Sequence, residues 1–174
     1  MQNGNAKDEG RAYDSGKAAG VLEDSVLLDR YFDQLTVGQE IKGTRGRTVT
    51  ETDIALFSSV SGDWNPIHND AAFANEGPFG TRIAHGLLLV SMMTGMAPIS
   101  GTAVVALYGF ERIRFVHPVH LGDTITYTSR VAALVPRGQD RGIADLDFEI
   151  RNQHGRPCVV GVIKILLNST PPAS

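Results

Sequence analysis

Several features that would assign this chain to a specialised class are missing from it. It has one cysteine, Cys158, in 174 residues, so no internal disulfide can form. No apolar run is long enough to cross a bilayer, and the polar N-terminus lacks the apolar centre of a signal peptide. The 16 basic and 19 acidic residues form no block of like charge, which argues against nucleic acid as a partner. We therefore expect a soluble, cytoplasmic protein with no membrane or nucleic-acid contacts.

Signatures of resident cofactors and metals are missing as well. The chain has neither a glycine-rich phosphate loop nor a dinucleotide-binding fingerprint. Asp63, His68 and His85 are residue types that bind metals, but no pair of histidines has a chelating helical spacing. A proline interrupts the closest pair, His117 and His120. We expect no metal and no cofactor of the protein's own.

The length and composition indicate one packed domain. A hydrophobic content of 42% in 174 residues is enough for one core, and the length argues against two. Residues 1–29 are mostly polar and small, which predicts a flexible segment, with a short docking helix as the alternative for its late leucines. No internal repeat is visible, so residues 30–170 are expected to form a single domain.

Helix signals lie in the first half of this domain. Thr50 and Asp53 have the spacing of a capping box, and Gly62 follows the apolar stripe, so a helix is expected between them. Asp70 can cap a second, short helix. Residues 85–98 are apolar on every face up to a terminal proline, and a helix without a polar face is expected to be fully buried.

Strand signals dominate the rest of the chain. A first strand is expected over residues 39–49, and four more over residues 103–116, 124–135, 143–151 and 157–167. Apolar and charged residues alternate from 144 to 151, which indicates a strand with one solvent-exposed face. One buried helix followed by an antiparallel meander predicts an α+β domain whose curved sheet wraps around the helix.

The most distinctive stretch is Ser-Gly-Asp-Trp-Asn-Pro-Ile-His at residues 61–68. It places a carboxylate, Asp63, five residues before an imidazole, His68. Pro66 keeps Asn65 out of helical geometry, so the pair is expected on a bent loop. Taken singly, an aspartate after glycine usually marks a turn and a lone histidine is usually structural. Together they supply the groups that general acid–base catalysis requires.

These residues resemble the MaoC-like (R)-specific enoyl-CoA hydratase family. The likeness spans about residues 31–167 and rests on four segments, residues 61–68, 83–86, 115–119 and 122–124. It implies a single hot-dog fold, in which an antiparallel sheet wraps around a buried central helix. It also implies a homodimer, or a multiple of dimers, with active sites at the subunit interface. Trp64 and Thr94 depart from residues often found in the family, which bears on substrate choice.

The resemblance implies hydration of trans-2-enoyl-CoA to (R)-3-hydroxyacyl-CoA, or the reverse dehydration. Asp63 and His68 are expected to act on one water as a coupled pair. The amide of Gly86, at the start of the buried helix, is the expected donor to the enolate-like oxygen, although a glycine there also permits close packing. The Thr94 hydroxyl either points at the pair or bonds back within its helix. Asn65 is grouped with the expected substrate-binding residues, but its main expected role is to lock the loop and not to contact the substrate.

The sequence leaves other assignments open. His85 is either a structural helix cap or a substrate contact. Coenzyme A enters only as part of the substrate, and its phosphates need a few local cations, for which the candidates are Arg47, Arg82, Arg112 and Arg114. Cys158 lies in an apolar stretch and is expected to be a buried, inert thiol. Two alternatives to the hydratase are a hot-dog acyl-CoA thioesterase and a non-catalytic acyl-binding subunit.

Overall fold

The computed structural model describes residues 30–43, 45–97 and 103–171. Residues 1–29, for which we expected a flexible segment or a docking helix, lie outside the described residues. No helix in the described ranges is long and apolar enough to span a membrane. The elements in chain order are η1 (Phe32–Gln34), β1 (Glu40–Lys42), β2 (Arg47–Thr48), α1 (Glu51–Ser61), α2 (Pro66–Asn69), α3 (Ala71–Glu76), α4 (Gly86–Met96), β3 (Val104–Phe115), β4 (Thr124–Pro136), β5 (Arg141–Arg151) and β6 (Pro157–Asn168).

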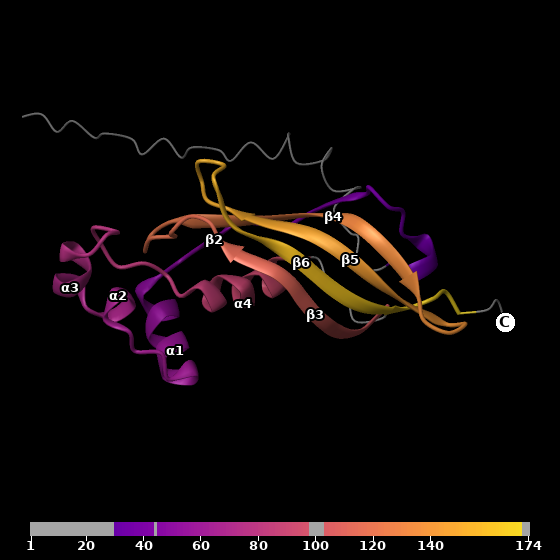
Figure 1. The fold of residues 1–174 in the computed structure, drawn as a ribbon, viewed down its shortest axis with the longest axis horizontal. Coiled ribbons are helices and arrows are strands. Elements are labelled where there is room, and N and C mark those ends of the chain that lie inside the picture. The colour runs from indigo at the N-terminus through magenta and orange to yellow at the C-terminus, as the bar shows by residue number, and fades with distance from the viewer. Residues whose placement is uncertain (1–29, 44, 98–102, 172–174) are drawn as a thin grey trace, which may run out of the picture.

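The strands form an antiparallel sheet in the order β1-β4-β5-β6-β3, and β2 pairs with β4 beside this path. Figure 1 shows the long strands curving over α4, with α1, α2 and α3 gathered at one end. The four long strands predicted from the sequence are confirmed. The strand expected over residues 39–49 is instead two short strands, β1 and β2. The domain is the expected single hot-dog of the α+β class.

Helix α4 supplies much of the core but is not buried on every face. Six of its side chains pack under the sheet, namely those of Leu88, Leu89, Val90, Met92, Met93 and Met96. Burying a side chain of this size contributes roughly 1.5–3 kcal/mol. The expectation of full burial was wrong, because the sheet covers one side of the helix only. Residues three and four apart share a face, and the opposite stripe of Leu87, Ser91, Thr94 and Gly95 is exposed.

Helix α1 begins and ends as its sequence predicts. The side chain of Thr50 accepts a hydrogen bond from the Asp53 amide at 3.3 Å, and the Asp53 carboxylate accepts one from the Thr50 amide at 2.9 Å. Gly62 ends the helix with a left-handed φ of 77°, which a residue without a side chain adopts at little cost. The chain therefore leaves α1 sharply and enters the segment that begins at Asp63.

Strand β3 contains a bulge that the sequence did not indicate. Between Glu111 and Arg114, β3 advances by three residues while its partner β6 advances by only two. Arg112 takes up the difference with a left-handed φ of 51°. One extra residue turns the side chains that follow to the opposite face of the sheet. Phe115 therefore faces α4, whereas Glu111, before the bulge, pairs with Lys164 on the outer face.

The capping box of α1 leads to a first prediction. Thr50→Ala is expected to lower the free energy of unfolding by about 1 kcal/mol, because the amide of Asp53 loses its side-chain acceptor. Thr52→Ala removes the same atoms from an exposed position in the same helical turn and is expected to stay within about 0.5 kcal/mol of the wild type. Urea denaturation of the two variants measures the difference. Equal losses would mean that the cap does not stabilise α1.

Candidate functional site

The predicted loop from Asp63 to His68 contains a helical turn. His68 lies in α2, so the expectation that both residues stand on a loop was wrong for His68. Asn65 is the N-cap of this turn, and its side-chain oxygen accepts a hydrogen bond from the Ile67 amide at 3.2 Å. Pro66 occupies the first helical position, where the missing N–H costs nothing. Asn65 therefore locks the bend, as expected, and is not among the residues that line the cavity beside it.

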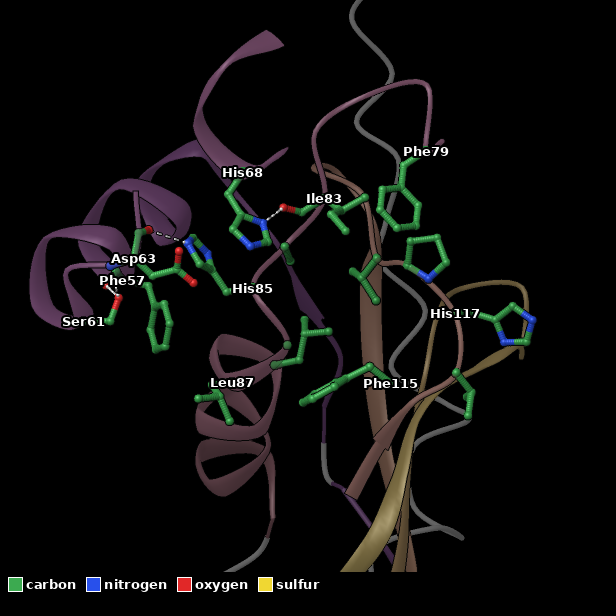
Figure 2. A pocket seen from close by; sticks show the side chains of 16 residues that line it. Phe57, Ser61, Asp63, His68, Phe79, Ile83, His85, Leu87, Phe115 and His117 are labelled. Atoms are coloured by element: carbon green, nitrogen blue, oxygen red, sulfur yellow. Dashed lines mark hydrogen bonds between the residues drawn. The ribbon is translucent and has the colours of Figure 1, made fainter. Parts of the chain in front are cut away.

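The His68 ring is held with one nitrogen turned toward the cavity. Nδ1 lies 2.7 Å from the carbonyl oxygen of Ile83. A carbonyl oxygen can only accept a hydrogen bond, so Nδ1 must carry the proton that is donated. In the neutral ring Nε2 is then bare, that is, unprotonated. Figure 2 shows this second nitrogen on the edge of the ring away from the Ile83 carbonyl. A buried imidazole with a bare Nε2 can accept a proton from a molecule in the cavity.

Asp63 and His68 are brought together, as the sequence predicts. One carboxylate oxygen of Asp63 and one ring nitrogen each of His68 and His85 all lie within 4.8 Å of one another. A water that bonds two groups, each about 2.8 Å away at a tetrahedral angle, holds them about 4.6 Å apart. The pair is therefore close enough to share a single water. Oδ1 of Asp63 also accepts a hydrogen bond from the Asn65 amide at 3.2 Å, which helps to orient the carboxylate.

His85 is a core residue directly behind this pair. It precedes the first residue of α4, is 2% exposed, and makes no side-chain cap bond. Its ring stacks on that of His68, with centroids 3.8 Å apart and planes 29° apart. Nε2 lies 3.0 Å from the carbonyl oxygen of Asp63 and 3.2 Å from Oγ of Ser58. Burial lowers the pKa of His85, so the ring is neutral at pH 7.

Asp63, His68 and His85 are residue types that bind metals, yet their arrangement does not suit an ion. The lone pairs of an imidazole lie in the plane of its ring. Two rings stacked 3.8 Å apart direct these lone pairs along nearly parallel planes, so they cannot meet at one ion with metal–nitrogen distances of about 2.0–2.1 Å. In addition, Nε2 of His85 is occupied by the Asp63 carbonyl. The geometry suits a water held by two groups better than a metal held by three.

The cavity beside the pair has a volume of about 580 Å³. Its polar end is formed by Asp63 and His68. Its walls are mainly apolar and come from α4, from the end of β3 and from the segment before α4, with the side chains of Phe79, Ile83, Leu87, Leu89, Phe115 and Val116. This combination of apolar walls and a few convergent polar groups is typical of a small-molecule site.

Gly86 lines the cavity at the first residue of α4. Its amide is one of the first-turn N–H groups that an α-helix leaves without a partner, so it can donate to a ligand. A Cβ at this position would lie 2.6 Å from the ring of Phe115. Glycine is therefore required for the packing of Phe115 against the helix. The two explanations offered by the sequence for Gly86 are compatible.

Thr94 does not reach the cavity. Its hydroxyl donates to the Ser91 carbonyl at 2.8 Å, which is the back-bonding alternative, and the residue lies on the exposed stripe of α4. The expectation that it points at Asp63 and His68 is not supported within one chain.

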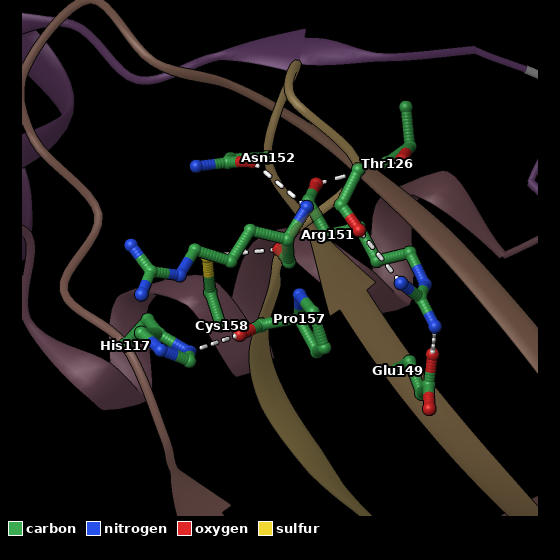
Figure 3. A network of polar contacts seen from close by, with 9 residues as sticks. His117, Thr126, Glu149, Arg151, Asn152, Pro157 and Cys158 are labelled. Atoms are coloured by element: carbon green, nitrogen blue, oxygen red, sulfur yellow. Dashed lines mark hydrogen bonds and ion pairs between the residues drawn. The ribbon is translucent and has the colours of Figure 1, made fainter.

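Sequence reasoning missed His117, which lines the cavity from the chain beyond β3. Figure 3 shows its Nδ1 bonded to the carbonyl of Pro157, at 2.7 Å. The signal that could have found it is its position two residues after Phe115, since alternate residues of an extended chain share a face. In the same network Cys158 is buried, and burial raises the pKa of its thiol, as expected for an inert cysteine.

Two of the four candidate arginines are held in ion pairs. Arg82 donates to both carboxylate oxygens of Glu51, at 2.8 and 2.6 Å, and Arg47 to Asp53 at 2.6 Å. For Arg112 and Arg114, on β3, the described residues offer no ion pair.

Comparison with known proteins adds three findings. The family model described as "MaoC like domain" matches residues 33–142. The Protein MaoC of Klebsiella aerogenes is 40% identical over 111 residues, which cover 63% of this chain and 33% of the relative. This chain therefore spans a third of the length of that relative. The (R)-specific enoyl-CoA hydratase of Aeromonas caviae is 34% identical over 133 residues, which cover 75% of this chain and 96% of the relative.

One solved structure is similar to this chain both in fold and in sequence. The structure described as a monoamine oxidase regulatory protein from Archaeoglobus superposes with a TM-score of 0.76 and 33% identity. The superposition covers 82% of this chain and 96% of that one.

The contact between Gly86 and Phe115 leads to a second prediction. Gly86→Ala is expected to lower the free energy of unfolding by about 1–3 kcal/mol, because the new Cβ overlaps the ring. In a Phe115→Ala background the same change is expected to cost little, since the overlapping ring is gone. Denaturation of the four proteins measures this coupling. A cost that is the same in both backgrounds would show that the contact does not require glycine.

Proposed function

This chain belongs to the MaoC-like domain family, and we propose that it adds water to trans-2-enoyl-CoA thioesters to give (R)-3-hydroxyacyl-CoA, and catalyses the reverse dehydration. Curated relatives named hydratase and dehydratase support an enzyme of the hydro-lyase type. The enoyl thioester, its coenzyme A carrier and the (R) product are our proposal. The observation that carries it is the closeness of Asp63 and His68, within reach of one shared water at the polar end of an apolar cavity.

The reaction needs a water that is held and deprotonated as it attacks. The Asp63 carboxylate and the unprotonated Nε2 of His68 both accept hydrogen bonds, so a water between them can donate one hydrogen bond to each. As the water oxygen bonds to C3 of the enoyl group, one of its protons passes to the pair. The pair returns a proton to C2, so atoms and charge balance over the cycle. Because the two groups share one water, we treat them as a unit.

The electrons of the double bond move onto the thioester oxygen during attack, and this oxygen needs a donor. The amide of Gly86 is suited to this role, because it stands in the first turn of α4, where free N–H groups and the helix dipole favour negative charge. The absence of a side chain at Gly86 leaves room for the thioester to approach. The apolar walls of the cavity then accommodate the acyl chain.

The central prediction concerns Asp63 and His68. Asp63→Asn and His68→Ala are each expected to lower kcat for hydration of a short enoyl-CoA by about a hundred- to ten-thousand-fold, the usual loss of general acid–base catalysis. The double variant is expected to be little worse than the worse single one, since either change destroys the arrangement around the water. The measurement is the decrease in absorbance of the enoyl thioester with purified proteins.

Two variants serve as matched controls for these losses. Asp70→Asn makes the same change on the same segment and keeps an N-cap of α3, since asparagine caps as well as aspartate. His154→Ala removes an exposed histidine from the turn between β5 and β6. Both are expected to keep near-normal rates. Near-normal turnover in Asp63→Asn or His68→Ala would remove that residue from the mechanism. Thiol release without loss of enoyl absorbance would favour the thioesterase alternative.

We also propose that the active unit is a homodimer, or a multiple of dimers, formed through β3. This strand ends the main sheet path, and within the described residues no strand pairs with its outer edge. Leu107 and Tyr108 on it are at least half exposed, and an open apolar edge is a surface that proteins normally cover. Antiparallel pairing of β3 with its own copy about a two-fold axis is self-complementary. Phe115 and Leu87 line the cavity yet are 52% and 62% exposed, so its wall is open on this side.

Sedimentation of two charge variants tests the dimer. Leu107→Asp is expected to give monomers with much reduced hydratase activity, because a desolvated charge at the edge opposes pairing. Val37→Asp makes a similar change at an exposed position before β1, at the opposite end of the sheet, and is expected to leave the assembly intact. A wild-type protein that is active as a monomer would overturn the proposal. So would Leu107→Asp that still sediments as a dimer.

A further inference from the structure

We propose that His85 is a positioning residue whose Nε2–H holds the backbone carbonyl of Asp63, so that the carboxylate stays aimed at the water beside His68. The inference rests on the hydratase function proposed above and assigns a role to the histidine that the sequence left open between a helix cap and a substrate contact.

The hydrogen-bond geometry decides which nitrogen of His85 carries the proton. The acceptor 3.0 Å from Nε2 is the main-chain carbonyl of Asp63, which has no hydrogen to give. Nε2 must therefore be protonated, and it shares this proton with Oγ of Ser58, 3.2 Å away. In the neutral ring Nδ1 is then bare. This agrees with Nδ1 being a buried atom without a hydrogen-bond partner among the described residues, since a protonated Nδ1 would leave a charged donor unpaired.

The hydrogen bond from His85 links the backbone of Asp63 to a distant part of the chain. The other hydrogen bonds of Asp63 within the described residues join it to Ser61 and Asn65, two positions away on either side. Such local bonds shape the turn, but they do not place it relative to α4. The bond to His85 spans 22 residues and connects the turn to the start of the helix. Without it, the carboxylate follows a backbone that is anchored only to its own neighbours.

The same ring also supports the second member of the pair. His68 is clamped between its bond to the Ile83 carbonyl and the stacked ring of His85. One side chain thus contacts both catalytic residues, Asp63 through the main chain and His68 through the ring face. His85 is not itself the acid or base, because Nε2 is bonded to Asp63 and Ser58 and the bare Nδ1 is a buried atom.

A matched pair of variants tests the hydrogen bond apart from the packing. His85→Gln places an amide N–H close to the position of Nε2, whereas His85→Met has the same chain length without a donor. Both lose the ring, so their difference reports the bond to Asp63. We expect His85→Met to lower kcat for enoyl-CoA hydration about ten- to a hundred-fold below His85→Gln, the scale of a misplaced catalytic group. KM is expected to differ by no more than about twofold between the two, because the cavity walls are unchanged.

The outcomes separate the inference from the proposed function. An active wild type with equal kcat values for His85→Gln and His85→Met overturns the inference alone, and so does a difference confined to KM. A wild type without hydratase activity overturns the proposed function and the inference with it. Thermal melts of both variants establish that the comparison is made between folded proteins.

Ser58→Ala provides a second arm that leaves the His85 ring in place. It removes the other acceptor of the shared proton, together with the hydrogen bonds between Ser58 and Asn69, and frees Nε2–H for Asp63 alone. We expect kcat to stay within about threefold of the wild type, because a hydrogen bond at a neutral site contributes modestly. If Ser58→Ala lowers kcat as much as is expected for His85→Met, the hydrogen bond from His85 to Ser58 in α1 is the important one, and the bond to Asp63 is not. That result overturns the inference even if the His85 variants do not fold.

Discussion

The packing of α4 against the curved sheet is the constraint on which the site depends. The six apolar side chains that this helix buries determine where its first turn lies. The groups that matter most are at or near that turn, namely the amide of Gly86, the ring of His85 and the carbonyl of Ile83 that holds His68. A shift of the helix would therefore move the Gly86 amide, the His85 ring and the His68 ring together. The hydrophobic core and the site are parts of one packing arrangement.

Two carbonyl groups decide what two adjacent histidines can do. The Ile83 carbonyl takes the Nδ1 proton of His68 and leaves Nε2 bare toward the cavity. The Asp63 carbonyl takes the Nε2 proton of His85 and leaves a buried Nδ1 bare instead. Identical side chains in stacked contact thus have opposite protonation patterns. One is suited to proton transfer with a bound water, and the other to holding the backbone, because the main chain presents its acceptors at different places.

Much of the local structure was predictable because short-range interactions determine it. The capping box at Thr50, the left-handed Gly62 and the alternation in β5 each depend on residues a few positions apart, and each was confirmed. Asp63 and His68 were identified from their spacing and from the family resemblance, and the structure brings them within reach of one water. The long strands were predicted to within a few residues because runs rich in β-branched and apolar residues are separated by turn residues, and in β5 they also alternate with a period of two.

The errors arose where contacts between distant segments decide the outcome. Composition predicted a fully buried α4, but the sheet lies on one side of the helix and leaves Thr94 exposed. The bulge at Arg112 that turns Phe115 toward Gly86 depends on the register with β6, and no local pattern encodes it. The sequence by itself determined most of the element types and the capping residues, because these depend on backbone sterics and periodicity, and the family resemblance singled out Asp63 and His68. Only the tertiary structure decided the tautomers of His68 and His85, because the carbonyls that set them come from distant segments of the chain.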